Sequence, residues 1–315
     1  MRGVLLLVKI GWRNLWRNPR GTLLTALALG LGLTLLLISL GLLDGSHEQM
    51  VGNGVRFGTG HVVIQARGYQ DTSSRELLLP SEVVSMTDQF LQAETMKHLV
   101  RGVSPRLLTS GLLSSASHAA GVHIMGVIPQ EEQAVSLIPQ RIIEGTYLTN
   151  ETQSGVVIGT ELARKLGVKI GAKVVLMTQA VSLPDTEAAD AAEGAMQSTL
   201  PRVIGIFRTG IQAIDAHIIQ LPLPAVQALL GVPDRVTQVA ILLAWEGDAL
   251  LVARGLRKQL AGVPVEVLPW RESMPRLAQL FLLDQAFNYV MNGVVLTMVG
   301  LGILNTILMR VLERR

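Results

Sequence analysis

The sequence of 315 residues predicts an α+β membrane protein, in which two transmembrane helices flank a mixed α+β domain and a short amphipathic helix comes first. Two stretches, residues 22–43 and 286–309, contain no charged side chain. Each is long enough to cross a hydrocarbon core, since a helix needs about 20 apolar residues to do so. The residues between them, 44–285, are mostly polar and alternate short strand and helix patterns, which indicates the α+β domain.

The charge pattern predicts the orientation. Basic residues precede the first span and follow the second, and basic flanks of transmembrane helices stay cytoplasmic. We therefore expect both ends of the chain in the cytoplasm and roughly residues 44–284 outside. Without residues 1–43, which hold five basic and no acidic side chains, and 310–315, which hold three basic and one acidic, 19 basic and 23 acidic side chains remain. That balance argues against a nucleic-acid partner.

Residues 1–18 predict an amphipathic cytoplasmic helix that lies in the membrane interface. At 100° per residue its basic side chains form a narrow stripe opposite apolar ones. The predicted anchoring residues are Trp12, Arg13, Trp16, Arg17 and Arg20. A plain basic anchor without a distinct helix is the alternative. A cleaved signal peptide fits poorly, because the apolar stretch exceeds the usual 7–15 residues and no A-x-A site follows it.

The first transmembrane helix is expected over 19–48 and the second over 281–310. Pro19 suits a first helical turn, where a missing amide hydrogen costs nothing. Small residues at Ala26, Gly30, Gly293 and Gly300 predict faces on which helix backbones approach closely. Because glycine and alanine are common in membrane helices anyway, this spacing is also compatible with no packing role.

The outer domain is expected over 49–280 as two subdomains. A helix-like continuation of the first span over 44–56 opens it, and the run Gly58-Thr-Gly60 breaks that helix. Strands are predicted over 61–66, 106–114, 121–127, 155–159, 173–178, 200–207, 236–243 and 263–269, and helices over 81–100, 160–166, 223–230 and 249–260. The acidic, alanine-rich segment near 182–199 predicts an exposed, mobile insertion.

Sequence patterns for catalysis are weak. The chain has no cysteine, which excludes disulfides, thiolate metal sites and cysteine nucleophiles. His118 and His123 have no neighbouring carboxylate that would complete a zinc site, and no Walker A sequence is present. The Glu131-Glu132 pair and the acidic cluster over 185–193 are interpreted as solvated surface. We expect that the chain is not an enzyme and that it binds no cofactor or metal itself.

Several motifs, taken in order, resemble the permease subunits of MacB-type (type VII) ABC transporters, most closely the lipoprotein-releasing branch. The motifs are IGWRNLWRNPRGTLLT over 10–25, Asp44-Gly45 with Gln49-Met50, GTGHVVIQ over 58–65, VVIGTELA over 156–163 with LGV over 166–168 and Gly171, and VIGIFRTG over 203–210 with Asp215 and Leu221-Pro222. Each motif alone is weak, but the resemblance covers essentially the whole chain.

The resemblance implies a mechanical role. Such permeases pair as homodimers or heterodimers and bind two cytoplasmic ATPase subunits, which hold the ATP and magnesium. ATP-driven movement of the membrane helices then shifts a periplasmic domain with the MacB-like core. We therefore expect a bacterial inner-membrane permease that extracts a lipoprotein or other envelope lipid and works with a periplasmic carrier or adaptor. The alternatives are a macrolide or peptide efflux permease, and a regulator of a cell-wall hydrolase.

A lipid cargo would need an apolar pocket at the outer ends of the two spans. The candidate residues are Leu40, Leu43, Met50, Phe281, Leu282, Phe287 and Met291. Ordinary helix packing is the competing interpretation of the same residues. Family members continue after the second span into a coupling segment and two more helices. We accordingly expect residues 311–315 to begin a coupling region that continues in a longer polypeptide or in another chain.

Overall fold

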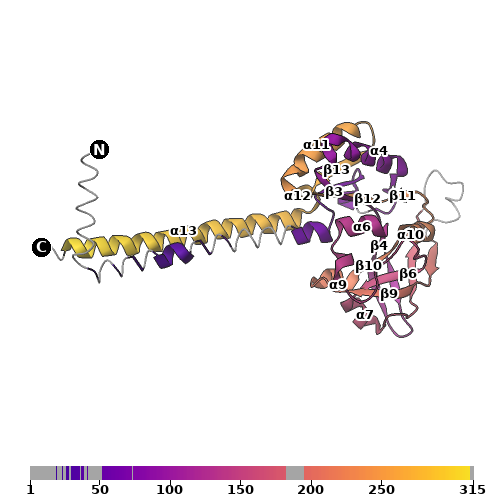
Figure 1. Cartoon of the computed structure of the whole chain (residues 1–315). Coiled ribbons are helices and arrows are strands. Elements are labelled where there is room, and N and C mark those ends of the chain that lie inside the picture. The colour runs from indigo at the N-terminus through magenta and orange to yellow at the C-terminus, as the bar shows by residue number, and fades with distance from the viewer. Residues whose placement is uncertain are drawn as a thin grey trace. The chain divides into compact units, whose positions relative to one another are not determined.

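The computed structural model describes residues 52–72, 74–181 and 195–312, together with residues 19, 23, 26–27, 30–35, 37–38 and 41, which are helical. The chain forms two compact units. Gly52–Pro275 forms one, which we call the sheet unit, and Met1–Val51 with Arg276–Arg315 forms the other, which we call the helical unit. Figure 1 labels the elements of both.

An 11-stranded mixed sheet runs through the sheet unit. Its order is β13-β1-β12-β3-β4-β10-β6-β9-β5, with β7 beside β3 and β8 beside β7. The strands are β1 Val62–Ala66, β3 Val100–Ser114, β4 Ala119–Val127, β5 Ile142–Gly145, β6 Gly155–Gly159, β7 Val175–Gln179, β8 Met196–Thr199, β9 Arg202–Phe207, β10 Ile218–Pro222, β12 Gln238–Leu243 and β13 Val265–Pro269. A separate antiparallel pair joins β2, Leu79–Pro80, to β11, Arg235–Val236.

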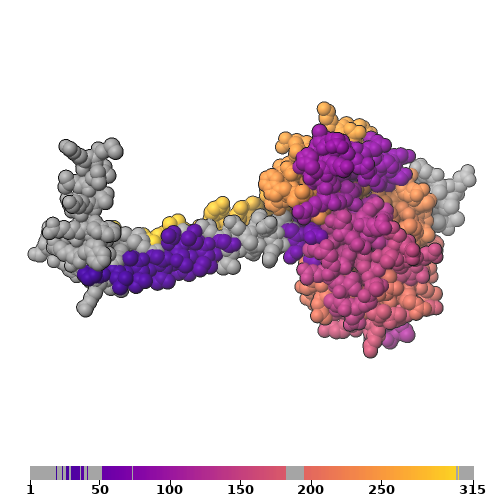
Figure 2. All heavy atoms as spheres, viewed as in Figure 1, coloured from indigo at the N-terminus to yellow at the C-terminus, as the bar shows by residue number. Residues whose placement is uncertain are grey.

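Strand β3 connects two lobes of this sheet. Over Val100–Arg106 it pairs with β12, and over Arg106–Ser114 it pairs with β4. We call the side with β1, β12 and β13 the first lobe and the side with β4 to β10 the second lobe. In Figure 2 the first lobe carries the purple and orange of the early and late chain, and the second lobe carries the colours of the middle. A 15-residue strand is thus the shared spine of both lobes.

Helices begin and end at residues that suit those positions. In α7, Thr160–Leu166, the last turn ends at Gly167 with φ 66°, a left-handed conformation that favours glycine. In α10, Leu223–Leu230, Pro224 lies in the first turn and the helix ends at Gly231. The remaining helices of the sheet unit are α3 Tyr69–Thr72, α4 Ser81–Gln92, α5 Glu94–Lys97, α6 Pro129–Val135, α9 Gln212–His217, α11 Ala249–Gln259 and α12 Trp270–Ser273, with short 3-10 turns at Ile138–Arg141 and Glu246–Asp248.

The apolar core lies between the sheet and these helices. Val62, Ile64 and Val239 of the first lobe and Val156 and Ile158 of the second are completely buried in one continuous cluster. Helices α4 and α11 meet closely, since a Cβ atom at Gly255 would lie 2.6 Å from the Phe90 ring. The mixed α+β fold predicted from the sequence is confirmed, with a core large enough to stabilise the sheet unit.

Some local predictions were wrong or incomplete. The predicted insertion near 182–199 includes Met196–Thr199, which forms β8 and pairs with β7, while residues 182–194 lie outside the described part of the chain. Helices α6 and α9 and strands β5 and β10 were not predicted. Strand β10 passes directly from Pro222 into α10, so no turn residue separates the two patterns. The helix predicted over 223–230 has the bounds of α10, while the apolar run before it was not predicted to be a strand.

Helix α13, Pro275–Leu312, has 38 residues and belongs to the helical unit from Arg276 onward. The predicted second transmembrane segment, 281–310, lies entirely within it. Most of the first predicted segment lies outside the described residues, as does the predicted interfacial helix over 1–18. Among the residues that the structure describes, no helix meets both the length and the apolar character needed to cross a membrane.

Candidate functional site

The chain enters and leaves the sheet unit at the same end of the first lobe. Val62, the first residue of β1, pairs with Pro269, the last residue of β13. Leu243, the last residue of β12, pairs with Val100, the first residue of β3. Gly60 bridges to Ile241 at this same end. We call this the junction end, because both connections to the helical unit leave the sheet there.

Hydrogen bonds fasten the two connecting segments to each other. The Trp270 amide donates to the His61 carbonyl at 2.9 Å, and the Thr59 and Ser273 hydroxyls lie 2.9 Å apart. The Gln70 amide group donates to the Ser273 carbonyl at 2.8 Å. The His61 amide also donates to the Ile241 carbonyl at 2.8 Å. These hydrogen bonds tie both connecting segments to the junction end of the sheet.

His61 is the titratable group at the centre of this junction. It is buried, and its Nδ1 accepts a hydrogen bond from the Leu243 amide at 3.0 Å. Burial, and secondly the positive charge of Arg101, lower the pKa of His61 to about 4. A neutral ring at physiological pH fits the hydrogen bond, because a protonated Nδ1 could no longer accept it.

A buried ion pair lies next to the junction end. The Arg106 guanidinium, on β3, donates from Nε to Glu132 Oε2 at 2.8 Å and from a terminal nitrogen to Glu132 Oε1 at 3.0 Å. Its other terminal nitrogen donates to the Gly58 carbonyl at 2.5 Å. Ser104 donates to Glu132 Oε2 at 2.8 Å. Because these side chains are almost fully buried, loss of either charge would leave the other unpaired.

Further hydrogen bonds extend from the ion pair into the second lobe. Gln220, on β10, donates to Glu132 Oε1 at 3.3 Å, and Tyr147 donates to the Gln220 side-chain oxygen at 2.9 Å. Burial, and secondly the Glu132 carboxylate, raise the pKa of Tyr147, so its hydroxyl stays protonated and remains a donor. One polar chain thus joins Gly58, beside the connecting segment, to both lobes.

The interpretation of Glu132 as solvated surface was wrong. Glu131 is exposed, but Glu132 is fully buried. The reason is that Pro129 starts a helix, and Pro129, Glu132 and Val135 lie on its buried face. Proline in a first helical turn was a usable signal for α6. The partner of Glu132, 26 positions earlier in the sequence, left no local signal.

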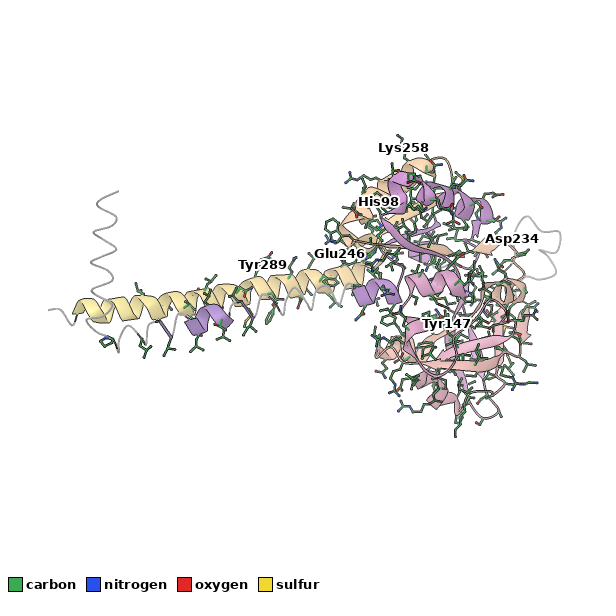
Figure 3. All side chains as sticks on the ribbon, viewed as in Figure 1. His98, Tyr147, Asp234, Glu246, Lys258 and Tyr289 are labelled. Atoms are coloured by element: carbon green, nitrogen blue, oxygen red, sulfur yellow. The ribbon has the colours of Figure 1, made fainter. Side chains whose placement is uncertain are left out.

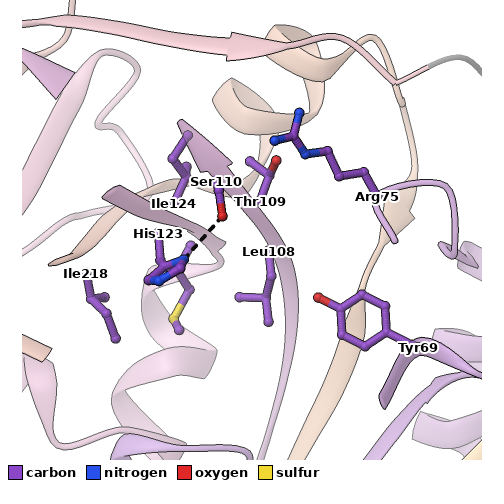
Figure 4. Close-up of a pocket in the computed structure, with 9 residues that line it drawn as sticks. Tyr69, Arg75, Leu108, Thr109, Ser110, His123, Ile124 and Ile218 are labelled. Atoms are coloured by element: carbon purple, nitrogen blue, oxygen red, sulfur yellow. Dashed lines mark hydrogen bonds between the residues drawn. The ribbon is translucent and has the colours of Figure 1, made fainter. Parts of the chain in front are cut away.

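A cavity of about 330 Å³ lies beside β3, β4 and β10. Figure 4 draws the residues that line it. Tyr69, Arg75, Leu108, Thr109, Ser110, His123, Ile124, Met125 and Ile218 line it. Ser110 and His123 lie within hydrogen-bonding distance, 3.2 Å. The Thr109 hydroxyl is buried and has no hydrogen-bond partner. No carboxylate lines the cavity to orient the histidine, and the described residues hold no cluster of three metal-binding side chains.

The structure separates the described members of the predicted cargo pocket. Phe281 is buried, whereas Leu282, Phe287 and Met291 are exposed. At 100° per residue, Phe287 and Met291 share one flank of α13, and Leu282 lies on the opposite flank. Leu40, Leu43 and Met50 lie outside the described residues, as do the predicted anchors Trp12, Arg13, Trp16, Arg17 and Arg20. A cargo pocket built from these residues stays a prediction.

Among the described glycines of the helical unit, Gly32 lies closest to a side chain of the other helix. A Cβ atom there would lie 2.6 Å from a methyl group of Val299. Cβ atoms at Gly30, Gly293 or Gly300 would have no neighbour within 4 Å, and Ala26 is exposed. The less exposed side chains of α13 form one stripe, Phe281, Asn288, Asn292, Val295 and Val299. Val299 places this stripe against the first helix, while roles for Ala26, Gly30, Gly293 and Gly300 stay predictions.

Comparison with known proteins gives one family match, the MacB-like periplasmic core domain, over residues 22–258. The lipoprotein-releasing system transmembrane protein LolC of Xylella fastidiosa (strain 9a5c) is 23% identical over 323 residues, covering 98% of this chain and 71% of that protein. LolE of Haemophilus influenzae, of the same system, is 24% identical over 220 residues, covering 69% of this chain and 50% of that protein.

Among solved structures, the periplasmic region of MacB from Actinobacillus actinomycetemcomitans is similar, with a TM-score of 0.47 and 14% identity over 70% of this chain and 94% of that one. The sequence motifs and the family match agree. The resemblance to MacB-type permeases is therefore confirmed.

Proposed function

Because the chain belongs to the MacB-like periplasmic core domain family, we propose that it is a permease subunit of an ABC transporter in the inner membrane of a bacterium, and that it releases lipoproteins. The names of its relatives LolC and LolE support lipoprotein release as the process. In this proposal the chain is not an enzyme. It passes on mechanical work from ATP hydrolysis in a partner.

The contacts at the junction end are the observation that supports the mechanical role. Both connections to the helical unit leave the sheet at one end, and the Thr59–Ser273 and Trp270–His61 contacts fasten them together. Two helices that moved in the membrane would thus act on the sheet as a pair. Movement of this kind needs contacts that differ between two states and requires no catalytic side chain.

The buried pair of Arg106 and Glu132 is the element that would carry this movement between lobes. It contacts Gly58 at the connecting segment and Gln220 in the second lobe. A buried ion pair resists separation, since parting the charges leaves each without its partner in a medium of low dielectric. We therefore assign it the role of a stiff link, so that the second lobe follows the junction end.

The proposed assembly places both chain ends in the cytoplasm and the sheet unit in the periplasm. Two copies of an ABC ATPase would bind from the cytoplasm, holding the ATP and magnesium, and a second permease, identical or related, would complete the dimer. A periplasmic carrier or adaptor would receive the lipoprotein. Basic residues at both ends of the sequence support this orientation.

Depletion of the chain in its source bacterium tests the function. We expect lipoproteins destined for elsewhere to accumulate in the inner membrane, as measured by membrane fractionation and labelling of their acyl chains. Normal lipoprotein distribution with increased macrolide sensitivity would favour the efflux alternative. Normal distribution with unseparated daughter cells would favour regulation of a cell-wall hydrolase. Either result would overturn lipoprotein release.

A pair of complementing variants tests the mechanism. Thr59→Val with Ser273→Ala removes the hydroxyl contact at the junction end. Thr149→Val removes a similar contact to Thr152, 3.0 Å long and exposed, in the second lobe. We expect the first variant to reach normal levels in the membrane but to restore release poorly, while the second restores it fully. Equal rescue by both would remove the junction contact from the mechanism.

A further inference from the structure

Three large apolar side chains are exposed close together in sequence, just after β12. Trp245 is 66% exposed, Leu250 is 52% exposed and Leu251 is 53% exposed. Trp245 follows the strand, and the two leucines occupy the first turn of α11. Exposed tryptophan with neighbouring leucines is unusual on a surface that faces only water.

This segment lies at the junction end of the sheet. Leu243, two residues before Trp245, pairs with Val100 at that end, and the Ala244 amide donates to the Leu99 carbonyl at 2.7 Å. Helix α11 begins there at Ala249 and leads to β13, whose last residue, Pro269, returns to the same end. Trp245 and the two leucines are therefore beside the place where the chain leaves for the helical unit.

The Trp245 side chain is held in a defined position. Its six-membered ring covers Gly247 so closely that a Cβ atom there would lie 2.3 Å from the ring. Glycine therefore permits the ring to fold over its own turn. A side chain fixed in this way loses less conformational freedom when it binds a surface, which favours binding.

The charges around the segment suit a lipid headgroup region. Three basic side chains are exposed nearby: Lys97 ends α5, His98 follows it, and Arg101 lies in β3. The Ala244–Leu99 hydrogen bond ties this stretch to the residue before Trp245. Figure 3 labels His98 and Glu246 on the first lobe. Glu246 and Asp248 are acidic and partly buried in the turn itself. Basic side chains beside an exposed tryptophan match the headgroup level of a bilayer, where phosphates lie outside the apolar core.

We propose that Trp245, Leu250 and Leu251 form a membrane-contact element that rests in the headgroup region of the outer leaflet. The proposal builds on the proposed function, which places both connecting segments at a membrane surface. The bilayer is the occupant that the geometry favours, because the junction end is the side from which both predicted spans leave. Tryptophan and leucine insert shallowly into such interfaces. The contact would limit how far the junction end tilts as the helices move.

Lipid quenching of tryptophan fluorescence tests this element in the full chain. The chain would be placed in vesicles of phosphatidylethanolamine and phosphatidylglycerol with brominated acyl chains. Trp12 and Trp16 would be replaced by phenylalanine, and the Trp245 signal would be taken as the difference on adding Trp245→Phe. Trp270 is buried and remains in both samples. We expect brominated lipid to lower the Trp245 emission by about twofold or more, and aqueous acrylamide to quench it weakly.

Leu200→Trp in the Trp245→Phe background is the matched control. Leu200 is 63% exposed and follows β8, which is joined through β7 to the far end of β3, near Ser114. With about 3.3 Å per residue, the two ends of β3 are about 45 Å apart. Tryptophan at position 200 should respond to acrylamide and not to brominated lipid.

The outcomes separate this inference from the function on which it builds. An alkaline wash first shows whether the chain stays in the vesicles, and its release would overturn both proposals. If the chain stays and Trp245 responds only to acrylamide, the contact element is wrong and the permease proposal stands. Protection of Trp245 from both quenchers would assign the surface to a second copy of the chain and would also overturn membrane contact.

Discussion

The sheet unit and α13 of the helical unit differ in how far their apolar side chains are exposed. In the sheet unit, the strands bury theirs: all five residues of β1 and all six of β12 are buried. Along α13, most large apolar side chains are exposed. They are Leu280, Leu282, Leu283, Phe287, Tyr289, Val290, Met291, Val294, Leu296, Met298, Leu301 and Leu304. The sheet unit supplies its own core, whereas among the residues that the structure describes these α13 side chains are not covered by other parts of the chain.

The two regions also differ in the polar groups they bury. The sheet unit buries a full ion pair with its hydrogen bonds satisfied, whereas the less exposed stripe of α13 contains no charged side chain. Each unit also holds a buried polar atom without a hydrogen-bond partner, for example the Thr109 hydroxyl in the sheet unit and the Asn292 side-chain oxygen in α13. The buried charges of Arg106 and Glu132 therefore favour one arrangement of the strands and helices around them. In the described part of the helical unit, a close approach of two helices lies at Gly32 and Val299. Variants in each region can sharpen or break this contrast.

The largest effect is expected from breaking the buried ion pair. Glu132→Gln leaves the Arg106 charge buried without a counter-charge, and we expect the sheet unit to lose about 3–5 kcal/mol of unfolding free energy. Urea denaturation followed by circular dichroism would measure it. Arg106→Met should have an effect of the same order, because it leaves Glu132 unpaired.

An exposed ion pair of the same unit provides the control. Arg257 and Glu272 lie 2.9 Å apart, but both side chains are nearly half exposed. Glu272→Gln should cost no more than about 1 kcal/mol, since water screens the pair. Equal losses from Glu132→Gln and Glu272→Gln would show that burial does not distinguish the two ion pairs.

The next effect is a pH dependence centred on His61. Its pKa is about 4 in the folded chain and near 6.5 when unfolded. Between these values the unfolded state binds the extra proton, so stability is full above pH 6.5 and declines as the pH falls toward 4. The decline due to His61 is at most about 3 kcal/mol. His61→Asn keeps an acceptor for the Leu243 amide and should flatten this part of the profile.

Denaturation of both proteins at pH 7.5 and pH 4.5 gives the comparison. Titration of other groups contributes equally to the two chains, so the difference between them isolates His61. A parallel decline in the wild-type chain and in His61→Asn would show that the junction end does not hold this histidine neutral.

Local features such as helix ends were predictable from the sequence, but the buried ion pair beside the junction end was not. Helix α7 ends at Gly167 as expected, because a glycine at a helix end acts through its own backbone. The pairing of Arg106 with Glu132 depends instead on β3 and α6 meeting in space, which no local pattern records. The adjacent glutamates at 131 and 132 looked equivalent in the sequence. Only the start of a helix at Pro129 separates the exposed one from the buried one.

The position of the helix contact was likewise not predictable from local spacing. The sequence spacing indicated Gly30, while the close approach occurs at Gly32. Both glycines lie in one apolar helix, and the rotation of that helix against α13 decides which one faces the partner. Spacing of small residues predicts that a contact face exists and leaves its position open.

A pair of glycine variants tests the contrast within the helical unit. Gly32→Leu would place a side chain where Val299 already lies, whereas Gly30→Leu has open space. We expect Gly32→Leu to cost about 1–3 kcal/mol, because overpacking forces the helices apart. Gly30→Leu should be neutral. Thermal unfolding of the detergent-solubilised chain would compare them, and equal midpoints would contradict the close approach at Gly32.

The smallest expected effect has the opposite sign. The Thr109 hydroxyl is buried at the cavity of Figure 4 without a partner, while Thr178 and Thr237 on neighbouring segments hydrogen-bond to backbone groups. Thr109→Val removes an unsatisfied group of nearly the same shape and should raise the unfolding free energy by about 1 kcal/mol. Thr237→Val, which removes the acceptor for the Leu108 amide, should lower it. If Thr109→Val also destabilises the chain, the hydroxyl has a partner in solution, and the cavity then holds water or a ligand that satisfies it.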